Sequence, residues 1–581
     1  MPDKFDSILF FIEYCCGRYK DKPAFIIRRK IRQERIRFAE LPRYLSLVES
    51  FFLKEKIKPG EKIILWGLNC PEYALMLLSC FGMSRIAIPI DYRTTQETIE
   101  KITDKTKPKY AFVSKYLKSD FLRQKKIKIY TLEDFFPLIE EIKPKHSWKK
   151  LLSSKIYNNH KQISEIIFTS GTTGVPKGVV IKQSHLLTNL KSVVNCLPKI
   201  NNPRIISILP LSHMLEQMIC FLTALYQGAT IYYLLRINSY RILLGFREYK
   251  PTHQIFVPQM LKIFWEKIEE GALKEGRLEK LKKALILSDY LPYVVRRIIF
   301  RKIHKMLGGK LQYIGCGGAP MDINIAANWQ RMGISVFEGY GATEVTAVAT
   351  FNRIGKDRLG TVGIPVDGVK VNLDYNGEIF IESPALADGY YLDKERTKLS
   401  FTPKGFKSGD IGEWDKDGYL RIIGRDAFKI VLSSGEKIYA EDLETKIKKE
   451  KEVKEVCVVA KRVAGADKIH AYFILKNQNK SSLKSVVENI NNRIESKEQI
   501  TSFEIWPQSD FPRTNTLKID RKLMFDYANK EKDLQEVISS INKQQAQYLD
   551  ILDVLAKVSG FAKDRINDRD KLTTDLELDS L

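Results

Sequence analysis

Apolar and polar residues over the first 360 positions form short apolar runs separated by helical segments. Runs rich in Ile, Leu and Val predict strands at residues 61–67, 86–90, 110–114, 163–171, 206–211, 252–258 and 311–318. Between them, helices are predicted at residues 72–83 and from Thr94 and Thr95 onward. Strands that alternate with helices in this way are typical of parallel sheets in α/β proteins. The pattern therefore predicts a large α/β domain built on two sheet subdomains.

The rhythm changes after Gly360, where short strands follow one another with turns between them. This series, at residues 368–373, 377–383 and 409–425, predicts a small β-barrel-like subdomain. Beyond Arg425, a compact α+β unit is predicted from helices at 439–449 and 484–494 and strands at 453–462 and 468–476. The predicted fold class is thus α/β multidomain, with an N-terminal domain over residues 1–425 and a mobile C-terminal domain over 426–529.

The longest apolar stretch covers residues 218–235, but polar residues and a glycine interrupt it. A membrane-spanning helix needs about 20 consecutive apolar residues, so this stretch predicts a buried helix and a strand divided by the turn at residues 227–230. The N-terminus has no long apolar segment, and the eight cysteines are scattered. Both features predict a cytoplasmic protein without a disulfide framework.

A length of 581 residues predicts more than one domain. The formal net charge of +25 predicts an acidic partner, such as nucleic acid, anionic lipid or an acidic protein. No zinc-finger spacing, basic heptad region or RNP-like aromatic run is found, so no nucleic-acid partner is expected. The basic amphipathic residues 296–305 are either an ordinary surface helix or a contact with anionic membrane, which would place the protein peripherally at the inner face of a membrane.

The densest chemical signal lies in residues 168–178, which read FTSGTTGVPKG. Three glycines, four hydroxyl side chains and Lys177 follow an apolar strand there. Glycines let backbone N–H groups close around an anion, hydroxyls donate further hydrogen bonds, and a lysine supplies positive charge. The spacing differs from that of a Walker A loop. The segment predicts a phosphate-binding loop.

This segment resembles the phosphate loop of the ANL superfamily of adenylate-forming enzymes, which includes acyl-CoA synthetases, luciferases and peptide-synthetase adenylation domains. The resemblance implies ATP and Mg²⁺ as cofactors. It also implies that the nucleotide is bound by Thr169, Ser170, Gly171, Thr172, Thr173, Gly174 and Lys177.

Other motifs similar to those of the superfamily follow in order along the chain. In residues 339–344 (GYGATE), the resemblance implies that Tyr340, between Gly339 and Gly341, stacks on adenine, that Thr343 binds the α-phosphate, and that Glu344 holds Mg²⁺. An aromatic ring beside glycines presents an open face, and a carboxylate is a hard ligand suited to Mg²⁺. Upstream, Gly318 and Ala319 resemble the glycine-rich wall beside the nucleotide.

The resemblance continues through the end of the predicted N-terminal domain and into the C-terminal domain. Asp410 matches the ribose-binding position, and Arg425 would meet the ribose and phosphates. In residues 512–518 (PRTNTLK), Lys518 matches the catalytic lysine that stabilises charge at the α-phosphate. Leu517 stands where the superfamily usually has glycine, and Ala427 stands at the hinge position, beside Asp426. After rotation of the C-terminal domain, the loop with Ser434 and Gly435 would serve thioester formation.

The acid and the thiol are predicted from two further segments. Residues 209–217 resemble the motif of long-chain acyl members in which a histidine, here His213, lies at the mouth of the acyl tunnel; this implies a fatty acid substrate. Residues 530–547 predict a linker. Residues 548–581 resemble the start of a helical acyl carrier domain, incomplete here, with Ser580 as the phosphopantetheine attachment point. The acceptor is then this carrier domain in cis or CoA.

Two other hypotheses stay open at this point. The first is a long-chain fatty acid–CoA ligase with a non-functional tail. The second is a non-catalytic, membrane-associated acyl-binding protein that keeps the fold. Retention of both Lys518 and Glu344 favours catalysis over the second hypothesis.

Overall fold

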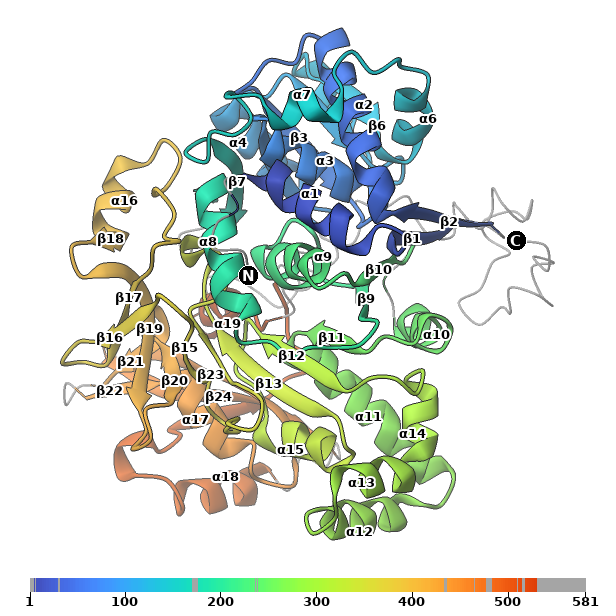
Figure 1. The fold of residues 1–581 in the computed structure, drawn as a ribbon. Coiled ribbons are helices and arrows are strands. Elements are labelled where there is room, and N and C mark those ends of the chain that lie inside the picture. Colours follow the sequence, from blue (N-terminus) through green and yellow to red (C-terminus); the bar gives the residue numbers. More distant parts are fainter. Residues whose placement is uncertain are drawn as a thin grey trace, which may run out of the picture.

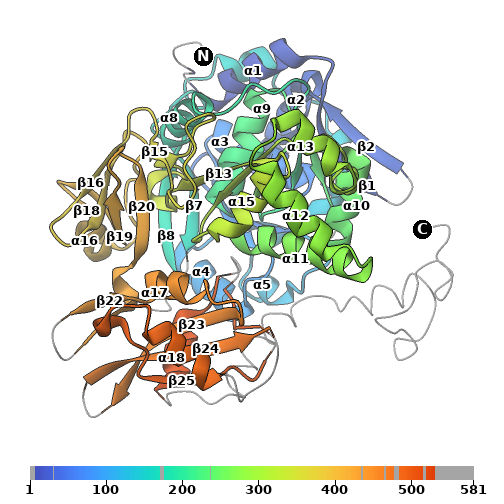
Figure 2. The ribbon, with the colours of Figure 1, turned by 90° about the horizontal axis from the view of Figure 1, so that it is seen from below.

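The structure is a computed structural model. It describes residues 5, 7–29, 32–169, 176–235, 237, 239–432, 436–463, 466–476, 483–508, 510–514 and 518–529. Six sheets and their helices form a large N-terminal part and a smaller C-terminal lobe (Figures 1 and 2).

The first sheet has six strands in the order β6-β5-β3-β4-β7-β8, parallel except for the β7–β8 pair. Its strands are β3 (Lys62–Gly67), β4 (Ile86–Asp91), β5 (Tyr110–Val113), β6 (Lys128–Thr131), β7 (Ile163–Thr169) and β8 (Lys177–Lys182). The helices of this region are α1 (Ile8–Tyr19), α2 (Leu41–Lys54), α3 (Pro71–Gly82), α4 (Gln96–Thr106), α5 (Asp120–Gln124), α6 (Phe135–Glu140), α7 (Trp148–Leu152) and α8 (Gln183–Val194). Helix α4 begins as predicted, because Thr95 caps it by accepting from the Thr98 amide.

The second sheet joins the N-terminal hairpin to the middle of the chain in the order β2-β1-β10-β9. Its strands are β1 (Pro23–Arg29), β2 (Arg32–Arg37), β9 (Arg204–Ser207) and β10 (Thr230–Tyr233), with α9 (Ala224–Tyr226) and α10 (Ser239–Tyr249) nearby. Residues 218–235 do form a helical segment followed by a strand. The helix begins with a π-helical stretch, η3 (Glu216–Thr223), which the periodicity did not predict. No helix among the described residues is both long and apolar enough to cross a membrane.

The third sheet runs β11-β12-β13-β14-β15 and is parallel from β11 to β13. Its strands are β11 (His253–Phe256), β12 (Tyr313–Gly317), β13 (Ser335–Tyr340), β14 (Thr350–Phe351) and β15 (Ile364–Pro365). Its helices are α11 (Pro258–Lys274), α12 (Leu278–Ser288), α13 (Tyr293–Ile299), α14 (Arg301–Met306) and α15 (Ile323–Arg331). The amphipathic residues 296–305 are therefore divided between two short helices that meet at Phe300.

The β-rich region forms a fourth, antiparallel sheet in the order β16-β17-β19-β18, with β20 also paired to β19. Its elements are β16 (Lys370–Leu373), β17 (Glu378–Glu382), α16 (Lys394–Ser400), β18 (Phe401–Thr402), β19 (Gly405–Trp414) and β20 (Leu420–Arg425). The C-terminal lobe contains β21 (Lys429–Val431), β22 (Lys437–Tyr439), α17 (Ala440–Ile447), β23 (Val453–Val463), β24 (Ala466–Leu475), α18 (Leu483–Asn491), β25 (Ser502–Ile505) and α19 (Arg521–Ala528).

The C-terminal lobe has hydrophobic clusters of its own, separate from the main cluster of the N-terminal part. Figure 2 shows it, in orange, as a distinct lobe beside the larger part. Ion pairs join the two parts, with Lys262 Nζ 3.6 Å from Glu455 and Arg421 2.7 Å from Asp442. The α/β fold with a large and a small part is as predicted; the boundary at residue 425 and the carrier domain stay predictions, and residues 530–581 lie outside the described residues.

Candidate active site

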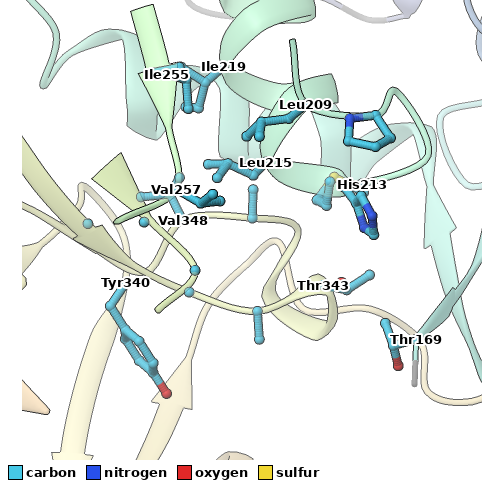
Figure 3. Close-up of a pocket in the computed structure, with 18 of the residues that line it drawn as sticks. Thr169, Leu209, His213, Leu215, Ile219, Ile255, Val257, Tyr340, Thr343 and Val348 are labelled. Carbon is cyan, nitrogen blue, oxygen red and sulfur yellow. The ribbon is translucent and has the colours of Figure 1, made fainter. Parts of the chain in front are cut away.

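A continuous cavity of about 1280 Å³ lies where the N-terminal part meets the C-terminal lobe. The last residues of four strands line it: Asp91 of β4, Thr169 of β7, Gly317 of β12 and Tyr340 of β13. Ligands of open α/β sheets bind outside the carboxyl ends of the strands, so the topology alone favours a site here. In Figure 3 apolar side chains such as Ile219 and Ile255 gather in the upper half of the view, while Tyr340, Thr343 and Thr169 lie below.

Tyr340, Asp410 and Arg425 form one polar cluster at the edge of this cavity. The Tyr340 hydroxyl donates to Asp410 Oδ2 at 2.8 Å, and Arg425 Nε lies 2.9 Å from Asp410 Oδ1. Burial and the charge of Asp410 raise the pKa of Tyr340 well above its usual value, so the phenol keeps its proton. A carboxylate has about four acceptor positions, so Asp410 can accept further hydrogen bonds from a ligand.

Lys518 reaches the same cavity from the C-terminal lobe. Burial and the nearby positive charge of Arg425 lower its pKa, the negative charges of Asp410 and Glu441 act in the opposite direction, and the resulting pKa is about 8. The ammonium group is therefore brought beside the Asp410–Arg425 pair and is held in a partly desolvated place. Such a group interacts strongly with a phosphate that enters the cavity.

Glu344 lies in the short 3₁₀ helix η4 (Thr343–Val345), directly after β13. Its carboxylate accepts a 2.8 Å hydrogen bond from the Tyr390 hydroxyl. The segment around Tyr390 is fixed against β8, because the Tyr391 amide donates to the Gly178 carbonyl at 2.7 Å. Lys177 Nζ lies 5.3 Å from the centre of the Tyr390 ring, so this tyrosine contacts a carboxylate through its hydroxyl and a cation through its ring. Burial and the charge of Glu344 raise the pKa of Tyr390.

The backbone around Tyr340 has no room for a side chain on the following residue. A Cβ atom on Gly341 would lie 1.8 Å from the Ala347 carbonyl oxygen, which is far inside van der Waals contact. Gly318, which faces the cavity, has a φ of +86°, in the region that favours glycine. These glycines are therefore required by the local geometry at two of the predicted positions.

His213 is held by an acidic partner that the sequence did not indicate. Its Nε2 lies 3.0 Å from Asp91 Oδ2, and Arg93 forms a bidentate ion pair with the same carboxylate at 2.7 and 3.0 Å. Burial raises the pKa of Asp91, but the hydrogen bond from His213 and the charge of Arg93 outweigh it and hold this pKa well below its usual value. Asp91 is thus a permanent carboxylate that fixes the orientation of the imidazole.

A buried polar network holds the loop that carries His213. Asn69 Nδ2 donates to the Leu209 carbonyl at 2.6 Å, and Asn69 Oδ1 accepts from the Leu211 amide at 2.8 Å. At the far end of the loop, Gln217 Nε2 donates to Glu165 Oε2 at 3.0 Å. Burial raises the pKa of Glu165 to about 8, so this carboxyl is mostly protonated at neutral pH. Hydrogen bonds from buried core residues therefore fix the position of the loop that carries His213.

The apolar part of the cavity is formed by α8, the π-helix η3, β11 and α11. Its walls include Val193, Leu197, Ile219, Ile255, Val257, Met260 and Ile263. Ile219 belongs to the π-helical stretch, and π-helical turns are frequent at functional sites. His213 lies at the junction between this apolar wall and the polar residues below it (Figure 3).

Most of the predicted site residues are brought together. Those that line the cavity are Thr169, Lys177, His213, Gly318, Gly339, Tyr340, Gly341, Thr343, Glu344, Asp410, Arg425 and Lys518. Ala319 does not line it. The remaining predicted positions lie outside the described residues: Ser170, Gly171, Thr172, Thr173, Gly174, Ser434, Gly435 and Ser580.

Sequence reasoning missed Asp91, Arg93 and Tyr390. Asp91 could have been found, because it is the first polar residue at the carboxyl end of a predicted parallel strand, where ligands bind. Tyr390 carried no such signal, since it lies in a long connection that returns to β8 only in the folded chain.

Residues 12–391 match the family model described as AMP-binding enzyme. The chain belongs to this family. The match covers Thr169, His213, Tyr340 and Glu344, and the resemblance to the adenylate-forming superfamily is thereby confirmed.

Three relatives of known name share between 28% and 31% sequence identity with this chain. Fatty acyl-CoA synthetase B of Dictyostelium discoideum is 31% identical over 326 residues, which are 51% of this chain and 48% of that protein. Long-chain-fatty-acid–CoA ligase FadD15 of Mycobacterium bovis is 28% identical over 321 residues, covering 52% and 53%. Human long-chain-fatty-acid–CoA ligase 1 is 28% identical over 436 residues, covering 67% and 62%. The chain spans about half the length of the first two of these relatives.

Solved structures share the fold over nearly the whole described chain. ATP-bound MatB from Rhodopseudomonas palustris aligns with a TM-score of 0.75 at 19% identity, over 90% of this chain and 100% of that one. The o-succinylbenzoate CoA synthetase of Bacillus subtilis, in complex with an acyl-adenylate intermediate, gives 0.72 at 17% identity, over 88% and 97%. At these identities the likeness shows a common fold.

Proposed function

We propose that this protein activates a long-chain fatty acid with ATP and then transfers the acyl group to a thiol. In the first step a carboxylate oxygen of the acid attacks the α-phosphorus, the bond to the β-phosphate breaks, and pyrophosphate leaves. In the second step a thiolate attacks the acyl carbon of the acyl-AMP, and AMP leaves. The observation that supports this proposal is the continuous cavity in which an apolar wall meets Asp410, Arg425 and Lys518.

The nucleotide would occupy the polar part of the cavity. Asp410 accepts from the ribose hydroxyls, Arg425 stays paired with Asp410 beside the phosphates, and Tyr340 offers its ring to the adenine. Lys177 and Thr169 flank the phosphate loop and would meet the β- and γ-phosphates. Thr343 would donate to the α-phosphate.

Glu344 fits a Mg²⁺ site in which the substrate phosphates supply the other ligands. No group of three or more acidic, histidine or cysteine side chains within the described part of the chain could hold a metal ion. Mg²⁺ is usually held by one or two carboxylates together with substrate phosphates, and the Glu344 carboxylate faces the cavity with Tyr390 fixing one oxygen. When bound there, Mg²⁺ would neutralise charge on the phosphates.

The acid would lie with its chain along the apolar wall and its carboxylate near His213. The relatives named as long-chain-fatty-acid–CoA ligases support this substrate class and favour CoA as the acceptor. The alternative acceptor is the phosphopantetheine of the carrier domain predicted at Ser580. The Ser434–Gly435 loop and a rotation of residues 426–529 remain our proposal for the thioester step.

ATP–pyrophosphate exchange with butyrate, octanoate, palmitate, oleate and a set of amino acids tests the first step. We expect exchange with palmitate and oleate well above that with butyrate or any amino acid. Tight binding of palmitate without exchange would refute catalysis and favour the acyl-binding hypothesis. Incubation with palmitate, ATP and either CoA or a pantetheinylated carrier then decides the acceptor.

The exchange reaction should lose activity as the pH rises above about 8. The ammonium form of Lys518 is the active form, and it loses its proton as the pH passes its pKa of about 8. The pH profile of kcat/KM for ATP reports groups of the free enzyme, so it should fall about tenfold per pH unit beyond this point. Lys518→Arg stays protonated and, although slower at pH 7, should lack this falling limb. If the decrease above pH 8 is unchanged in the arginine variant, it is caused by another ionisable group.

Enlarging Ile219 should shorten the acyl chain that the enzyme prefers. Ile219 is buried in η3 and lines the apolar wall, so Ile219→Phe places extra volume where a long chain would lie. We expect kcat/KM for palmitate to fall about tenfold relative to octanoate, in line with the roughly 1–3 kcal/mol by which pockets discriminate methylene groups. Ile219→Val is the matched control and should leave the ratio nearly unchanged. An equal loss of kcat/KM for both acids would show that the acyl chain does not lie against Ile219.

A further inference from the structure

Helices α12 and α13, with the turn between them, carry an unusual concentration of exposed large apolar side chains. Eight of them are between 37% and 84% exposed: Ile286, Leu287, Tyr290, Tyr293, Val294, Val295, Ile298 and Ile299. We call these eight residues the α12–α13 face. Soluble proteins rarely gather so many exposed apolar side chains without a partner for them. The helices lie on the lower surface of the molecule in Figure 1 and toward the viewer in Figure 2.

The α12–α13 face is held rigidly by the protein beneath it. Leu285 and Ser288 are the buried side of α12, and α13 is anchored by its arginines. Arg296 Nε donates to the Leu291 carbonyl at 2.7 Å, and Arg297 donates to the Leu311 and Gly333 carbonyls at 2.8 and 2.9 Å. These two arginines, which made residues 296–305 look like a basic surface helix, are therefore used to fix the face.

Positive charge surrounds the α12–α13 face. Residues 271–310 contain eleven Lys and Arg against three Asp and Glu. Exposed cations lie close in sequence to the apolar residues, at Lys282 and Lys283 on α12 and at Arg301, Lys302 and Lys305 on α14. Two of them have acidic neighbours, with Lys282 2.8 Å from Glu279 and Lys302 3.8 Å from Glu275. The third acid of this segment, Asp289, is paired with Arg331 at 2.8 Å. An apolar centre with a cationic border complements a surface that is negatively charged at its headgroups and apolar below them.

We propose that the α12–α13 face docks on the surface of an anionic lipid bilayer. The apolar side chains would enter the boundary between headgroups and acyl chains, the two tyrosines would sit at the headgroup level, and the border cations would bind the anionic headgroups. A second copy of this chain is a poor occupant, because it would bring the same positive border against itself. The binding requires neither ATP nor turnover and is independent of the proposed reaction.

Docking by this face would bring the acyl cavity close to the bilayer. Helix α11 packs on α12, and the first turns of α11 supply Met260 and Ile263 to the cavity wall. A fatty acid leaving the membrane would then meet the enzyme near its apolar pocket. This consequence, unlike the docking itself, rests on the proposed function.

Vesicle co-sedimentation of the full chain tests the proposal, without nucleotide or fatty acid. The vesicles are phosphatidylcholine alone or phosphatidylcholine with phosphatidylglycerol. We expect binding to the anionic vesicles only, weakened by salt. Two paired variants should each lower the partition coefficient about tenfold or more: Val294→Ser with Ile298→Ser, and Arg301→Gln with Lys302→Gln.

Matched controls separate this face from a general surface effect. Tyr375→Ser removes a side chain that is 95% exposed in the β-rich region, and Lys404→Gln with Lys416→Gln removes two exposed cations there. The controls should bind vesicles like the wild type. Because all of these side chains are exposed, the thermal unfolding midpoint should change little in every variant, and this is measured alongside.

Three results would overturn the proposal. One is an absence of binding to anionic vesicles. Another is binding that the two paired variants leave unchanged, which would place the contact elsewhere. The third is a wild-type chain that fails to bind vesicles but forms a dimer or captures a protein through this face, with the association lost in the Val294→Ser, Ile298→Ser variant. None of these results bears on ATP–pyrophosphate exchange, so failure here is distinguishable from failure of the proposed function.

Discussion

Replacement of Lys518 by alanine is expected to lower ATP–pyrophosphate exchange about 10²- to 10³-fold. This is the loss seen when one pre-positioned donor to a developing negative charge is removed. Lys518 is brought to the cavity by the C-terminal lobe, where partial burial makes its interaction with a phosphate stronger than it would be in water. The substitution should act mainly on kcat, because the ammonium is needed when charge develops at the α-phosphorus.

Lys522→Ala is the matched control for this substitution. Lys522 lies four residues further along, is exposed, and belongs to α19. Its removal should leave exchange near the wild-type rate. Transfer of the acyl group from added palmitoyl-AMP to the thiol should survive in Lys518→Ala, because that step has no α-phosphate attack. Exchange at the wild-type rate in Lys518→Ala would remove this lysine from the chemistry.

Glu344→Gln is expected to lower exchange at least about 10²-fold at ordinary Mg²⁺ concentration. The change keeps the shape of the side chain but removes the negative charge that would hold the cation beside the phosphates. Because the loss is one of metal affinity, higher Mg²⁺ concentrations should restore part of the rate. A titration of exchange against Mg²⁺ measures this as a shift of the half-saturating concentration.

Tyr390→Phe should produce a smaller version of the loss expected for Glu344→Gln. It removes only the 2.8 Å hydrogen bond to Glu344 and leaves the carboxylate charged. We expect a loss of about tenfold, in keeping with roughly 1.5–3 kcal/mol for a hydrogen bond to a charged group, and a smaller shift in the Mg²⁺ dependence. A Glu344→Gln enzyme with wild-type activity and unchanged Mg²⁺ dependence would contradict the assignment.

Local patterns in the sequence were sufficient for much of the fold and for the polar half of the site. Thr95 caps a helix where it was expected, and residues 218–235 divide into a helical segment and a strand at the predicted turn. Tyr340, Asp410 and Lys518 come from distant parts of the chain, yet the structure brings them to one cavity. Their motifs could be recognised because each is short and rich in glycine, hydroxyl or charged residues.

Features that depend on tertiary contacts were beyond the reach of these patterns. Tyr390 reaches Glu344 only because its segment pairs with β8. The π-helical form of η3 was not predicted, because all eight of its residues are buried and the pattern of apolar and polar residues therefore carries no information on helical pitch. Only the part of the α12–α13 face within residues 296–305 was singled out from the sequence, for a related reason: in a short helix, periodicity shows that one face is apolar but not whether anything covers it.

The most direct test of acyl-adenylate chemistry follows the oxygen atoms of the fatty acid. Palmitate labelled with oxygen-18 in both carboxylate oxygens is incubated with ATP, Mg²⁺ and the thiol acceptor. The masses of the products are then measured by mass spectrometry. Attack on the α-phosphorus followed by thiol attack on the acyl carbon predicts AMP that carries one labelled oxygen and pyrophosphate that carries none. Unlabelled AMP, or ADP with labelled phosphate, would contradict activation through acyl-AMP.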